Sequence, residues 1–287
     1  MVIVRIWEGV GNQMFQYAYA RALKEKGIDS RIDLDKVYDD KFVKYRNNDL
    51  RENVIQNFNI SLPSINVYKY GKYAYLDQDT VTRKIIFWLG SHFLWKYNFY
   101  EQKNPGYTKK AMLIKKNCYV KGWFQSENYF KKIRSILIRE FVPKEKIKIS
   151  RELKMAIEDP ESVSIHIRRG DYVKTNHALN LSYYEKAIEY IKRYYKRPYF
   201  VIFSDDLDWV ENNLHINEKF IYANKSGKLK DYEELFIMSR CKSIIISNST
   251  FSWWAAWLNR NEKKIIVAPK QWMKVQENIV PDDWIIV

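Results

Sequence analysis

The second half of the chain alternates apolar, strand-like segments with amphipathic, helix-like segments, and few folds accommodate that order. Apolar strands that alternate with helices form a parallel sheet covered by helices on both faces. We therefore expect residues 156–287 to form a Rossmann-like α/β domain. The strand-like segments lie at residues 162–165, 199–203, 220–222, 243–246 and 264–267, and the helix-like segments lie between them.

Two of these segments carry more specific signals. Residues 162–165 alternate polar and apolar side chains, which is typical of a half-buried strand. Ser182 and Glu185 have the spacing of a capping box, so we expect a helix to begin at Ser182.

The first half of the chain begins with the same alternation but then becomes irregular. Residues 38–116 show no clear period and are crowded with aromatic and lysine side chains. We expect a first lobe of residues 1–155 that carries this insertion, and a boundary within the charged stretch 143–160. The last residues of the chain either stay with the second lobe or pack back on the first. The expected elements of the first lobe are a strand at 2–7, a loop at 8–12, a helix ending near Lys26, a strand at 119–123 and a helix at 126–141.

Two adjacent arginines, Arg168 and Arg169, follow the strand that begins at Ser162. Ligands of open α/β sheets bind at the carboxyl ends of the strands, and arginine provides planar, permanently charged, bidentate donors. This position therefore suits a diphosphate, and Gly170 allows the sharp turn that follows. A purely structural interpretation stays open, in which the arginines only form salt bridges to surface acids.

The segment Ser247–Thr250 links another strand to a helix, which places small polar residues at a helix N-terminus. Backbone N–H groups at such a position bind anions. Ser249 or Thr250 can equally serve as the N-cap, and the two roles are compatible. Tryptophans at helical spacing follow, and we expect them in the core: Trp253, Trp254 and Trp257.

Acidic residues end a further strand of the same predicted sheet. Asp205 and Asp206 should therefore lie at the same edge, where a carboxylate can accept hydrogen bonds from a ribose or a nucleobase. Asp206 and Asp208 also have the Asp-x-Asp spacing of some metal-dependent sugar-nucleotide enzymes, although a capped helix start explains them better. The four histidines lack metal-ligand spacing, so we expect no metal site.

The composition limits the classes of partner. The chain has 49 Lys and Arg against 34 Asp and Glu, a formal charge of +15 that favours anionic partners. Dispersed lysine pairs without an RNA-binding signature argue against nucleic acid. Gly9 and Gly11 lack the third glycine of a dinucleotide fingerprint, which argues against NAD.

Cysteine use and hydropathy indicate the compartment. Cys118 and Cys241 each lie in an apolar segment, so we expect buried free thiols. The N-terminus lacks the pattern of a signal peptide, and no apolar stretch approaches the roughly 20 residues of a membrane span. We expect a cytoplasmic protein, with at most peripheral contact to the inner membrane.

Three segments, Gly11–Ala18, His166–Tyr172 and Ser247–Trp254, together carry a family resemblance that covers essentially the whole chain. They resemble the bacterial α-1,2-fucosyltransferases of glycosyltransferase family 11. The His-x-Arg-Arg-x-Asp element is the most specific part, since α-1,6- and protein O-fucosyltransferases share it. The resemblance implies a GT-B fold with two Rossmann-like lobes facing a central cleft, a GDP-β-L-fucose donor, inversion at the anomeric carbon, and no required metal or cofactor. Trp7 and Glu8 depart from the family pattern, in which a smaller residue precedes the first glycine.

The resemblance also implies a role for each predicted site residue. Arg168 grips the donor diphosphate and neutralises charge on the leaving GDP, and Arg169 assists it. The other implied donor contacts are Asn248, Ser249 and Thr250 near the phosphates, and His166, Asp205 and Asp206 at the guanine or ribose. Gly11, Asn12 and Gln13 line the acceptor side.

The general base for the acceptor hydroxyl is not identified. Asp171 is the nearest candidate in the sequence, but it can also serve only to orient the arginines. An oxocarbenium-like transition state would need little base assistance.

The expected reaction places α-1,2-linked fucose on galactose in a surface polysaccharide such as O-antigen, on an acceptor that a lipid diphosphate can carry. Two alternatives stay open. One is another linkage or nucleotide-sugar donor on the same fold, and the other is a basic protein that binds glycans or nucleic acid without catalysis.

Overall fold

The computed structural model describes residues 1–34, 53–65, 98–115, 117–272 and 279–287. The chain divides into two compact units, Met1–Phe141 and Val142–Val287. This division lies ahead of the expected boundary at residue 155. The charged stretch belongs to the second unit because helix α6, which it contains, packs against the first strands of that unit. Most of the irregular insertion expected at residues 38–116 lies outside the described residues.

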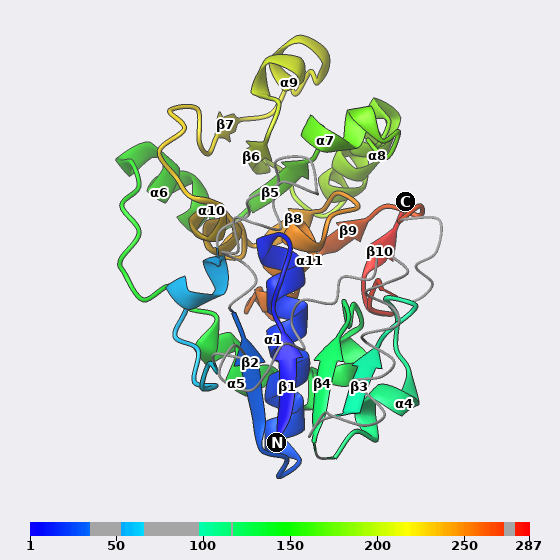
Figure 1. Cartoon of the computed structure of the whole chain (residues 1–287). Coiled ribbons are helices and arrows are strands. Elements are labelled where there is room, and N and C mark those ends of the chain that lie inside the picture. Colours follow the sequence, from blue (N-terminus) through cyan, green and yellow to red (C-terminus); the bar gives the residue numbers. More distant parts are fainter. Residues whose placement is uncertain (35–52, 66–97, 116, 273–278) are drawn as a thin grey trace. The chain divides into compact units, whose positions relative to one another are not determined.

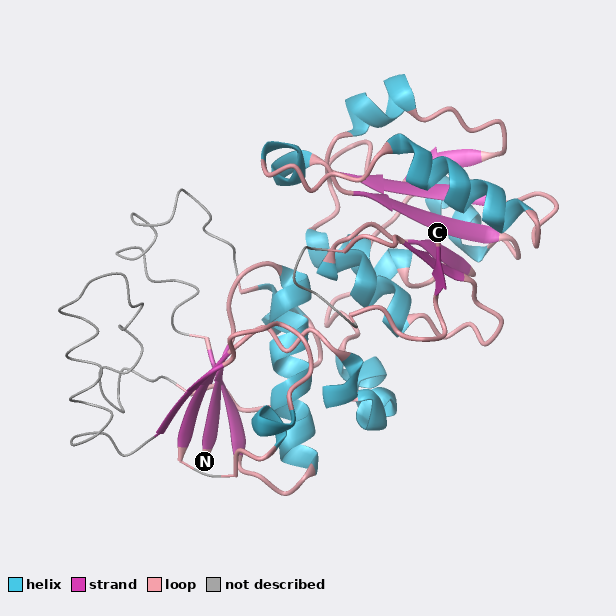
Figure 2. Ribbon diagram, turned by 90° about the vertical axis from the view of Figure 1, so that its right-hand side faces the viewer, coloured by secondary structure: helices cyan, strands magenta, loops and turns pink. Residues whose placement is uncertain are grey.

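The first unit is built on a parallel sheet with the strand order β2-β1-β4-β3. Helix α1 contacts β1 and β2, and Figure 2 shows it against one face of the four strands. Twelve of its sixteen residues are buried and most of these are apolar, so tertiary packing stabilises the helix. The elements are β1 (Val2–Arg5), α1 (Val10–Glu25), β2 (Ser30–Asp33), η2 (Val54–Asn57), β3 (Asn98–Glu101), α4 (Lys109–Met112), β4 (Cys118–Lys121), η6 (Glu127–Tyr129), η7 (Lys131–Ile133) and α5 (Arg134–Glu140).

Three expectations for this unit need correction. Helix α1 begins at Val10, so Gly11 and Asn12 lie in its first turn and not in a loop. Strands β2 and β3 were not predicted. The single helix expected at 126–141 is broken into two 3₁₀ turns and α5, because the backbone of Phe130 leaves helical geometry (φ −139°, ψ 0°).

The second unit has a six-stranded sheet in the order β10-β9-β8-β5-β6-β7, and all its strands are parallel, as the alternating pattern predicted. The strand order and the sixth strand, β10, were not predicted. Figures 1 and 2 show helices on both sides of its strands. The elements are α6 (Arg151–Glu158), β5 (Ser162–Ile167), α7 (Gly170–Lys174), α8 (Leu181–Lys192), β6 (Tyr199–Ser204), α9 (Leu207–Asn213), β7 (Phe220–Tyr222), α10 (Asp231–Met238), β8 (Ser243–Ile245), α11 (Thr250–Leu258), β9 (Ile266–Ala268) and β10 (Ile285–Ile286).

Two local predictions for the second unit were wrong. All six residues of β5 are buried, so this strand is not half-buried: it lies between β6 and β8, with helices on both faces. Helix α8 begins at Leu181 after Asn180, without a side-chain cap, so Ser182 lies inside the helix and makes no capping box.

The buried residues of the described chain include the tryptophans and cysteines that the sequence places in the core. The tryptophans of α11 are buried in the core, as expected. Cys118 and Cys241 are buried free thiols, also as expected. Within the described residues, each helix is too short or too polar to cross a lipid bilayer.

Candidate functional site

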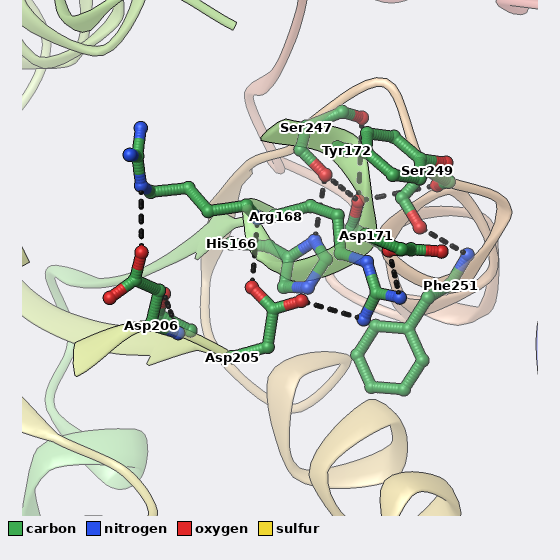
Figure 3. A network of polar contacts seen from close by, with 12 residues as sticks. His166, Arg168, Asp171, Tyr172, Asp205, Asp206, Ser247, Ser249 and Phe251 are labelled. Carbon is green, nitrogen blue, oxygen red and sulfur yellow. Dashed lines mark hydrogen bonds and ion pairs between the residues drawn. The ribbon is translucent and has the colours of Figure 1, made fainter. Parts of the chain in front are cut away.

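The carboxyl ends of three neighbouring strands of the second unit bring the predicted donor residues together. Strand β5 pairs with β6 on one side and with β8 on the other, all in parallel. The segments that follow these strands therefore meet at one edge of the sheet, and Figure 3 shows their side chains in one network of polar contacts. The convergence expected from the order of the elements is present in the structure.

Arg168 is the centre of this network. Its Nη2 atom lies 2.6 Å from Oδ1 of Asp171, and its Nη1 atom lies 2.9 Å from Oδ2 of Asp205. Burial disfavours the charged guanidinium, but the two carboxylates outweigh this effect and raise the pKa of Arg168. The two carboxylates hold the side chain in place. Because it is 27% exposed, a ligand in solution can still reach it.

Arg169 points to a different set of partners. Its Nε atom donates to Oδ2 of Asp206 at 3.0 Å, and its guanidinium carbon lies 3.7 Å from the ring centre of Trp209. Its backbone N–H donates to Oδ1 of Asp205 at 2.8 Å. The two guanidinium groups therefore have different partners, Asp171 and Asp205 for Arg168, and Asp206 and Trp209 for Arg169, while the Asp205 carboxylate contacts both residues.

Gly170 is needed here for space. Its φ is not positive, but a Cβ atom at this position would lie 2.7 Å from Oδ2 of Asp205. The expectation that Gly170 serves a sharp turn is thereby corrected, because Gly170 leaves room for the Asp205 carboxylate, which a side chain at this position would displace. The oxygen concerned is the one that pairs with Arg168.

His166 lies in β5, two residues before Arg168. It is 5% exposed, and its Nδ1 atom forms a 2.8 Å hydrogen bond with the hydroxyl of Ser247. Burial, aided by the positive charge of Arg168, lowers the pKa of His166 to about 3. The imidazole is therefore neutral at physiological pH and ties β5 to the loop after β8. This burial fits a positioning role better than the direct contact with guanine or ribose that was expected.

The loop after β8 ends at the N-terminus of α11. Ser249 is the N-cap, accepting a hydrogen bond from the backbone N–H of Phe251 at 3.3 Å, and Thr250 is the first helical residue. Asn248 is 2% exposed and donates through Nδ2 to the backbone oxygen of His177. Its Oδ1 atom has no hydrogen-bond partner among the described residues. A buried acceptor without a donor is costly, so this atom suits a ligand N–H or O–H.

Two acidic groups complete the edge. Asp206 caps α9 by accepting from the backbone N–H of Trp209 at 3.2 Å, which is the alternative predicted for the Asp-x-Asp spacing. In the described part of the chain, no group of three or more His, Cys, Asp or Glu side chains could hold a metal ion.

Burial raises the pKa of Glu234 on α10 to about 7, and Asp231 and Asp205 add to this effect. Sequence reasoning missed Glu234 because only burial distinguishes it from the other acids of that helix.

The predicted acceptor-side residues lie in the first unit. Asn12 donates through Nδ2 to Oε2 of Glu8 at 2.6 Å and accepts from Nε2 of Gln125 at 2.7 Å. Gln13 has no exposed surface, and its Oε1 atom accepts the backbone N–H groups of Val54 and Ile55 at 3.0 and 3.1 Å. Gln13 therefore positions a neighbouring segment, whereas Asn12 belongs to a partly exposed polar cluster. Gly11 is buried in the first turn of α1.

Glu8 and Trp123 belong to the same cluster, and neither was predicted as a site residue. The indole N–H of Trp123 donates to Oε2 of Glu8 at 3.1 Å. Glu8 has a φ of +67°, a conformation that favours glycine. In the sequence, Glu8 was noted only as a departure from the family pattern. That departure did not predict its hydrogen bonds with Asn12 and Trp123.

Comparisons with known proteins place this geometry in a family. The chain is 33% identical to the O-antigen biosynthesis glycosyltransferase WbnK of Escherichia coli over 96% of its own length and 97% of the relative. It is 30% identical to an α-1,2-colitosyltransferase of Escherichia coli over 99% of its own length and 98% of the relative. A galactoside 2-α-L-fucosyltransferase of Caenorhabditis elegans is 28% identical over 56% of this chain and 50% of the relative.

One solved structure, that of the NodZ α-1,6-fucosyltransferase soaked with GDP-fucose, aligns with 90% of this chain and 91% of its own. The TM-score is 0.46 and the identity 14%. The family model described as glycosyl transferase family 11 matches residues 1–286. On the strength of this match and of the two full-length relatives, the chain belongs to glycosyltransferase family 11.

Proposed function

We propose that this glycosyltransferase is an inverting, metal-independent fucosyltransferase. It moves L-fucose from GDP-β-L-fucose to a galactose hydroxyl, in α-1,2 linkage, during synthesis of a surface polysaccharide such as O-antigen. The observation that carries this proposal is the Arg168 guanidinium, held between Asp171 and Asp205 at the carboxyl edge of a parallel sheet. The names of the three relatives support the linkage and the pathway.

The charges of the cluster constrain how a diphosphate binds. Two arginines face three carboxylates, so without ligand the cluster has no excess of positive charge. Asp171 is the most exposed of the carboxylates, at 49%, whereas Asp205 is also fixed by the backbone N–H of Arg169. A diphosphate therefore displaces Asp171 from Nη2 of Arg168 and leaves Asp205 in place. The N-terminus of α11, where the first N–H groups lack acceptors within the helix, provides a second set of donors for phosphate.

The proposed reaction breaks the bond between the anomeric carbon and the diphosphate oxygen, and the electron pair leaves with GDP. Arg168 stabilises this developing charge, which is the task of a metal ion in other enzymes. The acceptor oxygen attacks from the opposite face and loses its proton. Asp171 is available as a base once Arg168 has turned to the diphosphate, and an oxocarbenium-like transition state is the alternative.

The first unit provides the acceptor side in this proposal. Asn12, Gln125 and Glu8 combine amide and carboxylate groups that suit sugar hydroxyls. Gln13 and Gly11 shape the cluster from beneath, since both are buried. This assigns contact with the acceptor to Asn12 and a positioning role to Gln13.

A second candidate is the same scaffold with another nucleotide sugar or linkage. The full-length relative named as a colitosyltransferase favours this alternative. The Arg168 contact to a diphosphate would be common to both, whereas the sugar pocket would differ.

The test is transfer from GDP-fucose to a panel of galactosides, with EDTA and without metal. The proposal predicts α-1,2-fucosylated product in EDTA. Turnover with another GDP-sugar alone would favour the second candidate, and turnover that requires Mn²⁺ would contradict metal independence. A glycan- or nucleic-acid-binding protein would show no transfer with any donor.

The proposed acceptor is carried on a lipid diphosphate, and the protein is cytoplasmic with peripheral contact to the inner membrane. Its charge of +15 supports this location. High salt should release the protein from membranes, because screening weakens surface electrostatics. Retention in high salt would contradict an electrostatic contact.

A further inference from the structure

The second unit has a pocket of about 890 Å³ on the side away from the donor residues. It is lined by the segment 142–149, by α6 and by the end of α10. Lys242, also in the lining, donates its backbone N–H to Ser162 at 2.9 Å, where β5 and β8 begin. Because Arg168 follows the other end of β5, the pocket lies at the amino edge of the sheet and is separate from the site described above.

The lining of the pocket is strongly basic. Six cationic side chains line it against two carboxylates, Glu145 and Glu158. Within the described chain, one of the six, Lys154, lies at ion-pair distance from a carboxylate, 3.9 Å from Glu158. The others are available to an external anion. The cationic residues are Lys144, Lys146, Lys148, Lys154, Arg240 and Lys242.

The rest of the lining is mainly apolar. Ile147, Ile157 and Phe236 contribute to it, and lysines alternate with isoleucines along 146–149. Met155, on the same helix as Lys154 and Ile157, is 59% exposed. A basic rim around an apolar floor, next to an exposed apolar side chain, is complementary to an anionic amphiphile.

We propose that this pocket binds an anionic phospholipid of a membrane surface. The headgroup phosphate is held by Lys144, Lys146 and Lys148, and the start of the acyl chain covers Ile147 and Phe236. The volume of about 890 Å³ lies within the range of roughly 300–1,000 Å³ that is typical of ligand pockets, which suits the headgroup and the start of one acyl chain. The floor is mainly aliphatic and has one aromatic side chain, Phe236, so with the exposed Met155 it favours an acyl chain over nucleic acid, whose bases stack on successive aromatic side chains. The inference needs no feature of the transfer reaction.

Co-sedimentation of the full chain with vesicles tests the proposal. The variant K144Q/K146Q/K148Q is compared with K186Q/K196Q/K263Q, which removes the same charge from exposed lysines of the same unit outside the pocket. On vesicles of phosphatidylcholine with phosphatidylglycerol, the pocket variant should lower the partition coefficient about 100-fold, at about fivefold per lysine. The control should lower it no more than about threefold. Equal losses in the two variants would overturn a specific site.

A soluble lipid separates the pocket from a diffuse surface charge. Dihexanoylphosphatidylglycerol, below its micelle concentration, should bind the wild type more tightly than glycerol phosphate does, and Ile147→Ser should remove that difference. Equal affinity for the two would show a phosphate site only. A DNA oligonucleotide that binds the wild type and not the pocket variant would assign the surface to nucleic acid.

Transfer to a soluble galactoside serves as the independent readout. It should be unchanged in the pocket variant, so that loss of membrane binding and failure of the proposed reaction are distinguished. Loss of transfer together with membrane binding would overturn the separation of the two sites.

Discussion

The carboxyl edges of the two sheets are built from different chemistry. In the second unit, Arg168 and Arg169 form ion pairs with carboxylates, above a buried and neutral His166. In the first unit, the polar cluster around Asn12 at the corresponding edge combines amides, an indole and the Glu8 carboxylate, joined by hydrogen bonds. The strands of that edge also end in Arg5, Asp33 and the ion pair of Lys121 with Glu101.

In the proposed function, this difference corresponds to a division of tasks between the two edges. Guanidinium groups interact strongly with a diphosphate, whereas amides and carboxylates suit the hydroxyls of a sugar. A transferase of nucleotide-activated sugars needs both. The comparison therefore predicts that substitutions at the two edges affect donor binding and acceptor use separately.

The largest effect is expected for Arg168→Ala. In the proposed reaction this guanidinium stabilises the leaving diphosphate, so its removal should lower kcat for transfer by about 10³-fold. Arg193→Ala, on the exposed surface of the same unit, is the matched control and should retain activity. Initial rates with GDP-fucose measure both, and circular dichroism verifies the fold. Near-normal turnover of Arg168→Ala would end the assignment of this edge to the donor.

Gln13→Ala should act on the first unit alone. It leaves the backbone N–H groups of Val54 and Ile55 without their acceptor, which should lower the free energy of unfolding by about 2 kcal/mol. GDP affinity at a temperature where the variant is folded should not change. Urea unfolding and calorimetry measure the two quantities, with the exposed Gln271→Ala as control. A parallel loss of GDP affinity would show that the two edges are not independent.

The pH dependence of stability should report on His166. Its pKa is about 3 in the folded protein against an ordinary value of 6.5, so between these values the unfolded chain binds a proton that the folded chain does not. The stability contributed by neutral His166 is complete above pH 6.5 and decreases as the pH falls from 6.5 towards 3. His166→Gln should flatten this decrease in urea midpoints, and the exposed His215→Gln should not. Identical profiles would contradict a buried neutral imidazole.

Gly170→Ala tests the close approach at Asp205. The added Cβ should displace the carboxylate that holds Arg168, and transfer should fall about tenfold, while stability changes by less than about 1 kcal/mol because Asp205 can move. Gly227→Ala is the matched control, since it has φ +64° and no atom within 4 Å of the new Cβ. The control should lose stability and keep its specific activity. Full activity of Gly170→Ala would show that the position of the Asp205 carboxylate does not matter for transfer.

The smallest effect is expected for Ser249→Ala. Loss of the N-cap of α11 should lower the free energy of unfolding by about 1 kcal/mol. Ser182→Ala, at the position wrongly expected to be a cap, should change it by less than about 0.5 kcal/mol. Thermal unfolding of both variants checks the pair. Equal shifts would show that Ser249 contributes no cap.

The second unit could be predicted from the sequence more fully than the first. Parallel topology follows from alternating strands and helices, and it brings Arg168, Asp205 and Ser247 to one edge without knowledge of any contact. Most elements of the second unit lie within a few residues of the predicted ranges, because its strands are apolar runs, as in β6, or alternate polar and apolar residues, as in β5.

The contacts within the sites could not be predicted in the same way. These contacts depend on residues distant in the sequence. Examples are the pairing of Arg168 with Asp205, the space needed at Gly170 and the complete burial of Gln13. The raised pKa of Glu234 arises from burial, which no local pattern encodes. The positive φ of Glu8 contradicts its intrinsic preference and results from its tertiary contacts.

Calorimetric titration of GDP into the wild type and Arg168→Lys tests the contact between Arg168 and the diphosphate most directly. Lysine keeps the charge but loses the planar, bidentate fork, so GDP should bind the variant at least about tenfold more weakly. Guanosine, which has no phosphate, should bind the two proteins equally. Equal GDP affinity in both proteins, or an equal loss for guanosine, would contradict a diphosphate contact at Arg168.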